Sequence, residues 1–346
     1  MKKILYILFL SVIISCGYAE DISSPNKSAS TAAVLSENWG SWTDNKETIS
    51  LTELQRKLSD TQITGKNAAA LVALAKCLNI SKKQSITKNE TLKIIDSKFY
   101  KIKYDAASEA VEAINRNLFA SGKPDFGKLQ QGPAGDCYFF SGTGWIAKNR
   151  PDVIINAIHK TEDNKYHVRF PDGESVVIEP PSDAELIYVN SVSTLSDGLW
   201  MGILQKALGA RRESGKAATD DILDINSGTA KSAVHMWTGH NFNRYVLKRS
   251  KENVVRRELI FMQEHKLMAE AATDNHSGKL PDDHDYAVLG FDKETDTLTL
   301  WNPWGIDVNI KGESGPQNGY EQKKGIFTIK LSDFKRFFFT LVIEKN

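Results

Sequence analysis

Hydrophobic and polar positions divide the chain into segments of different texture. Apolar residues recur at helical spacing from Leu51 onward, and a run rich in alanine and leucine follows over residues 68–78. This pattern predicts a small helical unit of three or four helices over residues 46–118, with Ser50 and Thr87 as N-caps. Whether the unit is a propeptide, a docking module or a structural support stays open at this point.

The pattern becomes a mixture of helices and strands after residue 124. One helix is predicted to begin at Cys137 and another to cover residues 199–210. Strand-like segments are predicted at 166–170, 175–179, 284–291, 297–301, 325–331 and 339–344. The C-terminal segments favour an antiparallel sheet, and the chain is therefore predicted to have an α+β fold.

The beginning of the chain is typical of a targeting signal. Lys2 and Lys3 precede an apolar run over residues 4–14, and small residues follow it. The run is shorter than the ~20 residues of a membrane-spanning helix. We therefore expect a secretory signal peptide over residues 1–19, and no later stretch is apolar enough to span a membrane.

The segment Ile-Ile-Ser-Cys that ends at Cys16 resembles the lipobox of bacterial lipoproteins, in which the cysteine becomes acylated. Ordinary cleavage after Ala19 is the alternative. Residues 20–45 are rich in Ser, Asn, Thr and Asp, which predicts a flexible tether. We expect an exported protein, either a lipoprotein of the cell envelope or a periplasmic or extracellular protein, that contacts a membrane only through a lipid on Cys16.

Composition and charge narrow the classes of partner. Apolar residues make up 41% and charged residues 25% of the 346 residues, as in ordinary soluble globular proteins. Lys plus Arg (44) balance Asp plus Glu (43), so the net charge of +1 gives no electrostatic basis for binding nucleic acid. We expect a monomer. With only three cysteines, Cys77 and Cys137 are expected to be free thiols, and Cys77 is expected to be a small core residue.

One segment carries the residues that a cysteine nucleophile needs. A thiol must lose its proton before it attacks a carbonyl, and an ordinary cysteine has a pKa of ~8.5. Cys137 follows a Gly135-Asp136 turn at the predicted helix start, where the positive helix end and a nearby imidazolium would stabilise the thiolate. The oxyanion of the intermediate needs donors, and the candidates are the backbone N–H of Cys137 and the side-chain amide of Gln131. A single cysteine in an apolar helix is, taken alone, far more often a buried core residue than a nucleophile.

A thiol protease also needs an imidazole that a third group holds in place. Of the seven histidines, only His284 has an obvious partner. The segments on either side of a turn centred near residue 293 are predicted strands, and a hairpin folded there sets His284 opposite Asn302, with Cβ atoms about 5 Å apart. Pro303 then ends the second strand because it cannot donate a hydrogen bond to the ladder.

Three blocks of the sequence resemble the calpain family of cysteine proteases. The segment Gln-Gly-Pro-Ala-Gly-Asp-Cys-Tyr-Phe-Phe (residues 131–140) is similar to the signature around the family's nucleophile. His-Asp-Tyr-Ala-Val-Leu-Gly (residues 284–290) resembles its His-Ala-Tyr-x-Val-x-Gly block, and Trp-Asn-Pro-Trp-Gly (residues 301–305) resembles its Asn-Pro-Trp-Gly block. The resemblance covers about residues 120–346.

The resemblance implies a papain-like protease core of two subdomains, over residues 120–228 and 229–346. It also implies a cysteine endopeptidase that acts on protein or peptide substrates. The family's roles then fall on Cys137 as nucleophile, His284 as base, Asn302 as the group that orients the histidine, Gln131 in the oxyanion hole and Trp304 as an aromatic cover.

Asp285 stands where the family usually has alanine. Because neighbouring residues of a strand point to opposite faces, we expect Asp285 to point away from the site and to be solvated. A role as a backup carboxylate is the alternative.

Two departures from the family's pattern concern calcium. Gln205 replaces a glutamate that holds the ion in calcium-activated members, and Lys128 lies where a carboxylate would be expected. Calcium prefers several oxygen ligands, so we expect no cofactor or metal and activity without calcium. Two other functions stay open: a catalytically inactive binding protein with the calpain fold, and a transglutaminase-like acyltransferase that shares the Cys–His chemistry.

Overall fold

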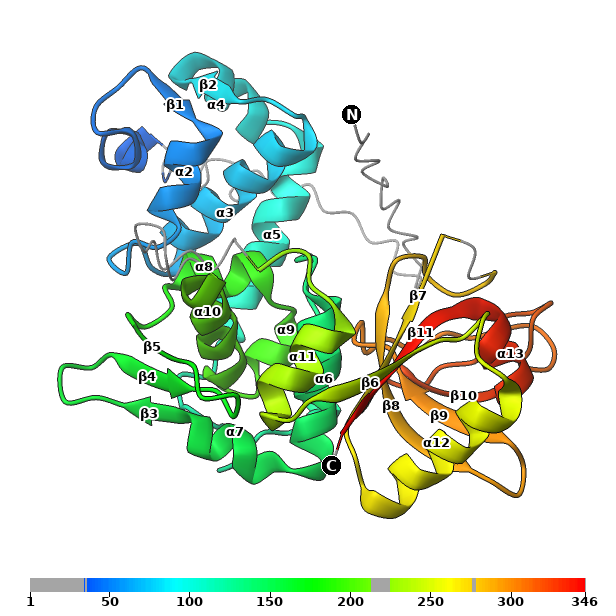
Figure 1. Cartoon of the computed structure of the whole chain (residues 1–346). Coiled ribbons are helices and arrows are strands. Elements are labelled where there is room, and N and C mark those ends of the chain that lie inside the picture. The colour runs from blue at the N-terminus through cyan, green and yellow to red at the C-terminus, as the bar shows by residue number, and fades with distance from the viewer. Residues whose placement is uncertain (1–33, 35, 213–224, 276–277, 346) are drawn as a thin grey trace.

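The computed structural model of the protein describes residues 34, 36–212, 225–275 and 278–345 (Figure 1). The predicted signal peptide with its Cys16 lies outside the described residues. Buried apolar side chains form three cores, which are centred on the N-terminal, middle and C-terminal parts of the chain. Among the described helices, none combines the length and apolar character needed to cross a membrane.

The N-terminal core belongs to a helical unit. Its elements are β1 (Thr48–Ser50), α2 (Leu51–Lys57), α3 (Gly65–Ile80), β2 (Ser85–Thr87), α4 (Lys88–Ile95) and α5 (Lys98–Glu112). Ser50 and Thr87 cap α2 and α4 through complete capping boxes with Glu53 and Glu90, which confirms both predicted N-caps. The alanine- and leucine-rich α3 is buried over most of its length and forms the centre of the unit.

The prediction of a flexible tether over residues 20–45 is wrong for the last part of that range. Residues 36–43 are helical, and Trp39 and Trp42 are 3% and 1% exposed within the core of the helical unit. The indole N–H of Trp39 donates to the backbone carbonyl of Lys46 at 3.0 Å. Two large aromatic side chains bury enough apolar surface to hold a segment that is otherwise polar.

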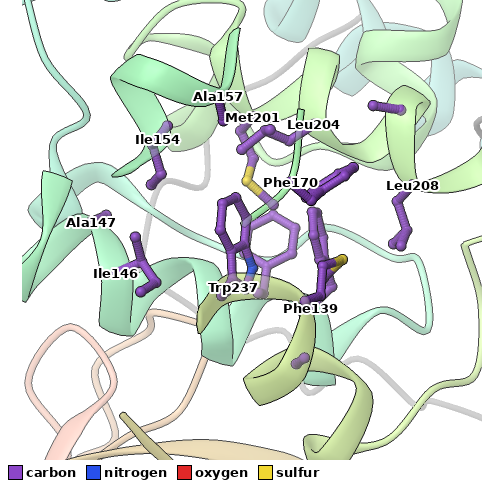
Figure 2. Close-up of a cluster of buried hydrophobic side chains, with 14 of the residues drawn as sticks. Phe139, Ile146, Ala147, Ile154, Ala157, Phe170, Met201, Leu204, Leu208 and Trp237 are labelled. Atoms are coloured by element: carbon purple, nitrogen blue, oxygen red, sulfur yellow. The ribbon is translucent and has the colours of Figure 1, made fainter. Parts of the chain in front are cut away.

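The middle core surrounds helix α6. The elements of this part are η1 (Phe126–Lys128), α6 (Cys137–Asn149), α7 (Pro151–Ala157), β3 (Ile158–Lys160), β4 (Tyr166–Arg169), β5 (Ser175–Ile178), α8 (Asp183–Val189), α9 (Val192–Leu195), α10 (Trp200–Arg212) and α11 (Ala230–Thr238). Trp237 of α11 stacks on Phe139 of α6 with ring centroids 5.9 Å apart, and it meets Phe170 edge-on at 5.7 Å (Figure 2). These contacts hold α6 in place. The middle part also contacts the helical unit, because Leu186 and Ile187 of α8 pack into the core of that unit.

The C-terminal part is built on an antiparallel sheet with the strand order β10-β9-β8-β7-β11-β6 (Figure 1). Its elements are β6 (Phe242–Val246), α12 (Glu252–His265), β7 (Ala269–Thr273), β8 (Asp285–Asp292), β9 (Thr297–Trp301), β10 (Ile326–Lys330), α13 (Leu331–Phe337) and β11 (Phe338–Glu344). Along β8, Ala287 faces the core around α6, whereas Tyr286 and Val288 face the core with α12 and α13. Both faces of the sheet are therefore covered. The predicted α+β fold is confirmed.

Candidate active site

Cys137 is the first residue of α6, as the sequence predicted. In the loop before it, the backbone N–H of Gly135 donates to Oδ1 of Asn226 at 2.6 Å. Gly132 is required by close packing, because a Cβ atom there would lie 2.1 Å from the carbonyl oxygen of Val189. The loop is therefore held against neighbouring segments, and Cys137 remains partly exposed at its end.

Helix α6 lies directly against β8 and β9. Ser141 Oγ donates to the backbone carbonyl of Asp285 at 2.9 Å, and the indole N–H of Trp145 donates to a β8 carbonyl at 3.0 Å. A Cβ atom on Gly144 would lie 2.2 Å from a ring carbon of Trp301 in β9, so only glycine allows this approach. The helix that carries the thiol is thus locked to the hairpin that carries the histidine.

His284 comes just before β8, and Asn302 comes just after β9. The Nε2 atom of His284 lies 2.9 Å from Oδ1 of Asn302, and the imidazole centroid lies 4.7 Å from a ring centroid of Trp304. Asn302 is itself held, because its Nδ2 donates to Oε1 of Gln322 at 3.2 Å. With Nε2–H donating to an amide oxygen, Nδ1 of His284 is left to accept a proton.

The histidine and asparagine meet in a different register from the predicted one. The turn lies further along the chain than predicted, since Asp292 pairs with Thr297, and the register next to the turn would set Ala287 opposite Asn302. A bulge in β8 shifts the pairing by one residue, so the register extended beyond Trp301 sets Tyr286, rather than His284, opposite Asn302. Since His284 and Tyr286 lie on the same face, the histidine reaches the asparagine diagonally.

The prediction that Asp285 is solvated is wrong. Asp285 is 8% exposed, and its Oδ2 atom lies 3.9 Å from Sγ of Cys137. It does lie on the opposite face from His284, but α6 rather than water covers that face. Within the described part of the chain, the thiol makes its side-chain hydrogen bond to this carboxylate, and none joins it to His284.

The pKa values show which protonation state this packing favours. Burial raises the pKa of Cys137 well above its ordinary value and the charge of Asp285 raises it further, while the backbone N–H groups of Asp285 and Tyr138 lower it. Burial lowers the pKa of His284 to about 4, and the hydrogen bond to Asn302 opposes that shift. Burial raises the pKa of Asp285 to about 7, and the thiol opposes that shift. The site as it stands holds a neutral thiol and a neutral imidazole at pH 7, because burial outweighs the helix end that was expected to stabilise a thiolate.

The side-chain amide of Gln131 is occupied in this structure. Its Nε2 donates to the backbone carbonyl of Ala134 at 2.8 Å and to Oδ1 of Asp136 at 3.2 Å. Asp136 also accepts a hydrogen bond from Nε2 of Gln205 at 2.8 Å, and its complete burial raises its pKa to about 7. To act as an oxyanion donor, Gln131 must exchange one of its two acceptors for the substrate oxygen.

The residues that depart from the calcium pattern have partners within the protein. Gln205 bonds Asp136, and Nζ of Lys128 lies 3.9 Å from Oδ1 of Asp197. Across the described ranges, no three His, Cys, Asp or Glu side chains come together in a group that could hold a metal ion.

Sequence reasoning missed Glu270 on β7. Its side chain is completely buried, and neither carboxylate oxygen has a hydrogen-bond partner within the described residues. Burial raises the pKa of Glu270 well above its ordinary value, and the charge of Asp285 adds to the shift. The available signal was a single acid in the apolar segment 267–272.

Comparison with known proteins places the chain in a family. The family model described as calpain family cysteine protease matches residues 80–345, more than three quarters of the chain. The match begins within α3 and so includes part of the helical unit. No curated protein matches the chain. With a thiol at the start of α6 and a His–Asn pair on the facing hairpin, the chain belongs to the calpain family of cysteine proteases.

Proposed function

We propose that the protein is an endopeptidase that hydrolyses peptide bonds through a thioester on Cys137 and does not need calcium. The observation that carries the proposal is the hydrogen bond between His284 and Asn302, made on the hairpin to which the helix of Cys137 is docked. This is the arrangement that a thiol protease requires: a sulfur at a helix start, and an imidazole whose far nitrogen is held by an amide.

In the proposed reaction, Nδ1 of His284 takes the thiol proton and the sulfur attacks the carbonyl carbon of the peptide. The charge on the carbonyl oxygen is stabilised by the backbone N–H of Cys137 and the amide of Gln131. The imidazolium then gives its proton to the leaving amine as the C–N bond breaks, which leaves a thioester. Water adds to the thioester while His284 takes its proton, the C–S bond breaks, and the proton returns to the sulfur as the acid leaves.

One observation favours a second candidate, a calpain-fold binding protein without activity. The thiol of Cys137 contacts the carboxylate of Asp285 instead of His284, and a carboxylate beside a thiol opposes its ionisation. A functional enzyme must overcome this contact, whereas a binding protein need not.

A casein digest by the wild type and by Cys137→Ser separates these candidates. We expect cleavage by the wild type, none by the variant, and release of free acids rather than amides when a primary amine is present. Iodoacetamide should label Cys137, which is partly exposed at the start of α6, far faster than Cys77, which is 5% exposed in the core of the helical unit. No digestion together with equally slow labelling of both cysteines would favour the binding protein.

We propose further that the protein is exported by a bacterium and anchored through a lipid on Cys16. The support is the charged, apolar and small-residue pattern of residues 1–19. Expression of the full chain and of Cys16→Ala, followed by membrane fractionation, tests the anchor. The wild type should sediment with membranes and the variant should not; equal distribution of the two would argue for plain secretion.

A further inference from the structure

Asp285 gives the nucleophile a second titratable neighbour, at a position set by the backbone. Its Oδ2 lies 3.9 Å from Sγ of Cys137, and its own backbone N–H also donates to that sulfur. Its backbone carbonyl accepts a hydrogen bond from Ser141 Oγ at 2.9 Å, four residues further along α6. The backbone of Asp285 is therefore tied to α6 at two points. A mobile surface carboxylate would not have this constraint.

A second acid lies behind this contact. In the β7–β8 ladder, Glu270 is opposite Ala287 and Asp285 is opposite Ala272, so the two acids are diagonal neighbours on the face that α6 covers. A Cβ atom on Gly142 of α6 would lie 2.7 Å from Oε1 of Glu270, which places that carboxyl beneath the helix. Oδ1 of Asp285 and both oxygens of Glu270 have no hydrogen-bond partner among the described residues.

The surrounding groups supply no charge that would compensate an ionised Asp285. The titratable groups around Asp285 and the thiol are Asp136 just before α6, Tyr138 on α6, Glu270 on β7, His284 just before β8 and Tyr286 on β8. Burial raises the pKa of both tyrosines and of Glu270 and lowers that of His284, which in each case disfavours the charged form. Of the described groups, none that shifts the pKa of Asp285 is a cation. Asp136 also raises the pKa of the thiol, but by less than Asp285 does, and Asp285 is the acid whose carboxylate oxygen lies against the sulfur.

We propose that Asp285 is a further catalytic residue, whose protonation decides whether Cys137 can become a thiolate. This inference rests on the proposed cysteine-protease function. With Asp285 ionised, the thiol donates to the carboxylate, and loss of the thiol proton would leave two negative charges in contact. With Asp285 protonated, its O–H donates to the sulfur while the thiol proton passes to Nδ1 of His284. The reactive form therefore carries one proton more than the resting form, and that proton comes from solvent.

The pH at which this change occurs follows from the burial of the carboxyl. Because burial raises the pKa of Asp285 to about 7, the acid is protonated below neutrality and ionised above it. Cys137 is then reactive in weakly acidic solution and suppressed in weakly alkaline solution. A family member with alanine at this position would lack the suppression.

The test measures the alkylation rate of Cys137 by iodoacetamide, followed by mass spectrometry of the full chain at pH 5.5 and at pH 8. Wild type is compared with Asp285→Asn, which keeps the shape and removes the charge, and with Asp285→Ala, the residue usual in the family. If one variant fails to fold, the other still decides the question. At pH 8 both variants should react at least about tenfold faster than the wild type, because lowering the pKa of the thiol by one unit raises a small thiolate fraction tenfold. At pH 5.5 their rates should differ from that of the wild type by less than about threefold.

Glu270→Gln is the matched control, because it removes a buried carboxyl next to Asp285 but not at the sulfur. Its alkylation should keep the pH dependence of the wild type. The role of Asp285 would be overturned if the alkylation rate of its variants, divided by that of the wild type, were the same at both pH values, or if neither protein reacted. It would also be overturned if Glu270→Gln changed the alkylation rate as much as the Asp285 variants do. A casein digest of the wild type separates the two proposals: pH-dependent alkylation without digestion refutes only the peptidase, and digestion with pH-independent alkylation refutes only the role of Asp285.

Discussion

The substitution Asn302→Ala tests whether the orientation of His284 governs the reactivity of Cys137. It removes Oδ1, which accepts Nε2 of His284 at 2.9 Å and the backbone N–H of Trp304 at 3.1 Å. His284 is 5% exposed, so its Nε2–H would be left without a partner in a buried place. Leaving such a donor unpaired costs about 1–3 kcal/mol, which corresponds to a loss of about 5- to 150-fold in rate. The hydrogen bond also raises the pKa of His284, so its removal makes the imidazolium still harder to form.

The assay is the steady-state cleavage of a peptide that the wild type hydrolyses. We expect kcat to fall by that factor and KM to change little, because Asn302 touches the histidine and not the substrate. Gln322→Ala is the matched control, since Oε1 of Gln322 contacts Nδ2 of Asn302 at 3.2 Å and leaves the His284 contact in place. The fall of kcat in Gln322→Ala should stay below about threefold. Equal losses in both variants, with both folded by circular dichroism, would refute the argument that the His–Asn contact itself matters.

Three further predictions concern Gln205, Lys206 and Asp285. Addition of EGTA should leave kcat/KM unchanged, because the amide at Gln205 bonds Asp136 instead of offering a carboxylate to calcium; a loss that calcium restores would contradict this. Lys206→Met should lower the free energy of unfolding in urea by about 3–5 kcal/mol, because it deprives the buried carboxylate of Glu185 of an ammonium 3.0 Å away; a loss under about 1 kcal/mol would be evidence against the pair. Asp285→Asn should raise Tm relative to the wild type more at pH 8 than at pH 4.5. The pKa of Asp285 is about 7 in the folded protein and about 4 in the unfolded chain, so the stability that the protonated carboxyl contributes is present below pH 4 and is lost as the pH rises through 7. An equal Tm difference at both pH values would contradict this.

The features that could be predicted from the sequence are those that it marks locally. The Gly-Asp turn before Cys137 predicts the start of α6. Pro303 predicts the end of β9 at Trp301, because a proline cannot donate a hydrogen bond to a neighbouring strand. The N-caps at Ser50 and Thr87 need only a hydroxyl and a glutamate three residues later. In each case the physical cause lies within a few residues of the feature.

What could not be predicted depends on segments far apart in the chain. Strand alternation correctly separates Asp285 from His284, but it does not tell what covers each face. The cover on the face of Asp285 is α6, which begins at Cys137, and the cover on the other face is formed by α12 and α13. The bulge in β8 is likewise absent from the alternation pattern, and it changes which residue stands opposite Asn302.

Burial raises the pKa of Cys137 whichever way Asp285 is protonated, and beside it the charge of Asp285 and the helix end act on the thiolate in opposite directions. A helix N-terminus stabilises an anion by about 0.3–1 kcal/mol, and by up to ~2 kcal/mol where it is partly buried. A unit charge about 4 Å away acts with about 4 kcal/mol at an effective dielectric constant of about 20. At 3.9 Å, an ionised Asp285 therefore outweighs the helix end, whereas a protonated Asp285 leaves the helix end and its own O–H to act together. In the proposed mechanism, one acid in place of the family's alanine thus makes the reactivity of the nucleophile depend on the pH of the solution, although the helix that presents the sulfur is the same.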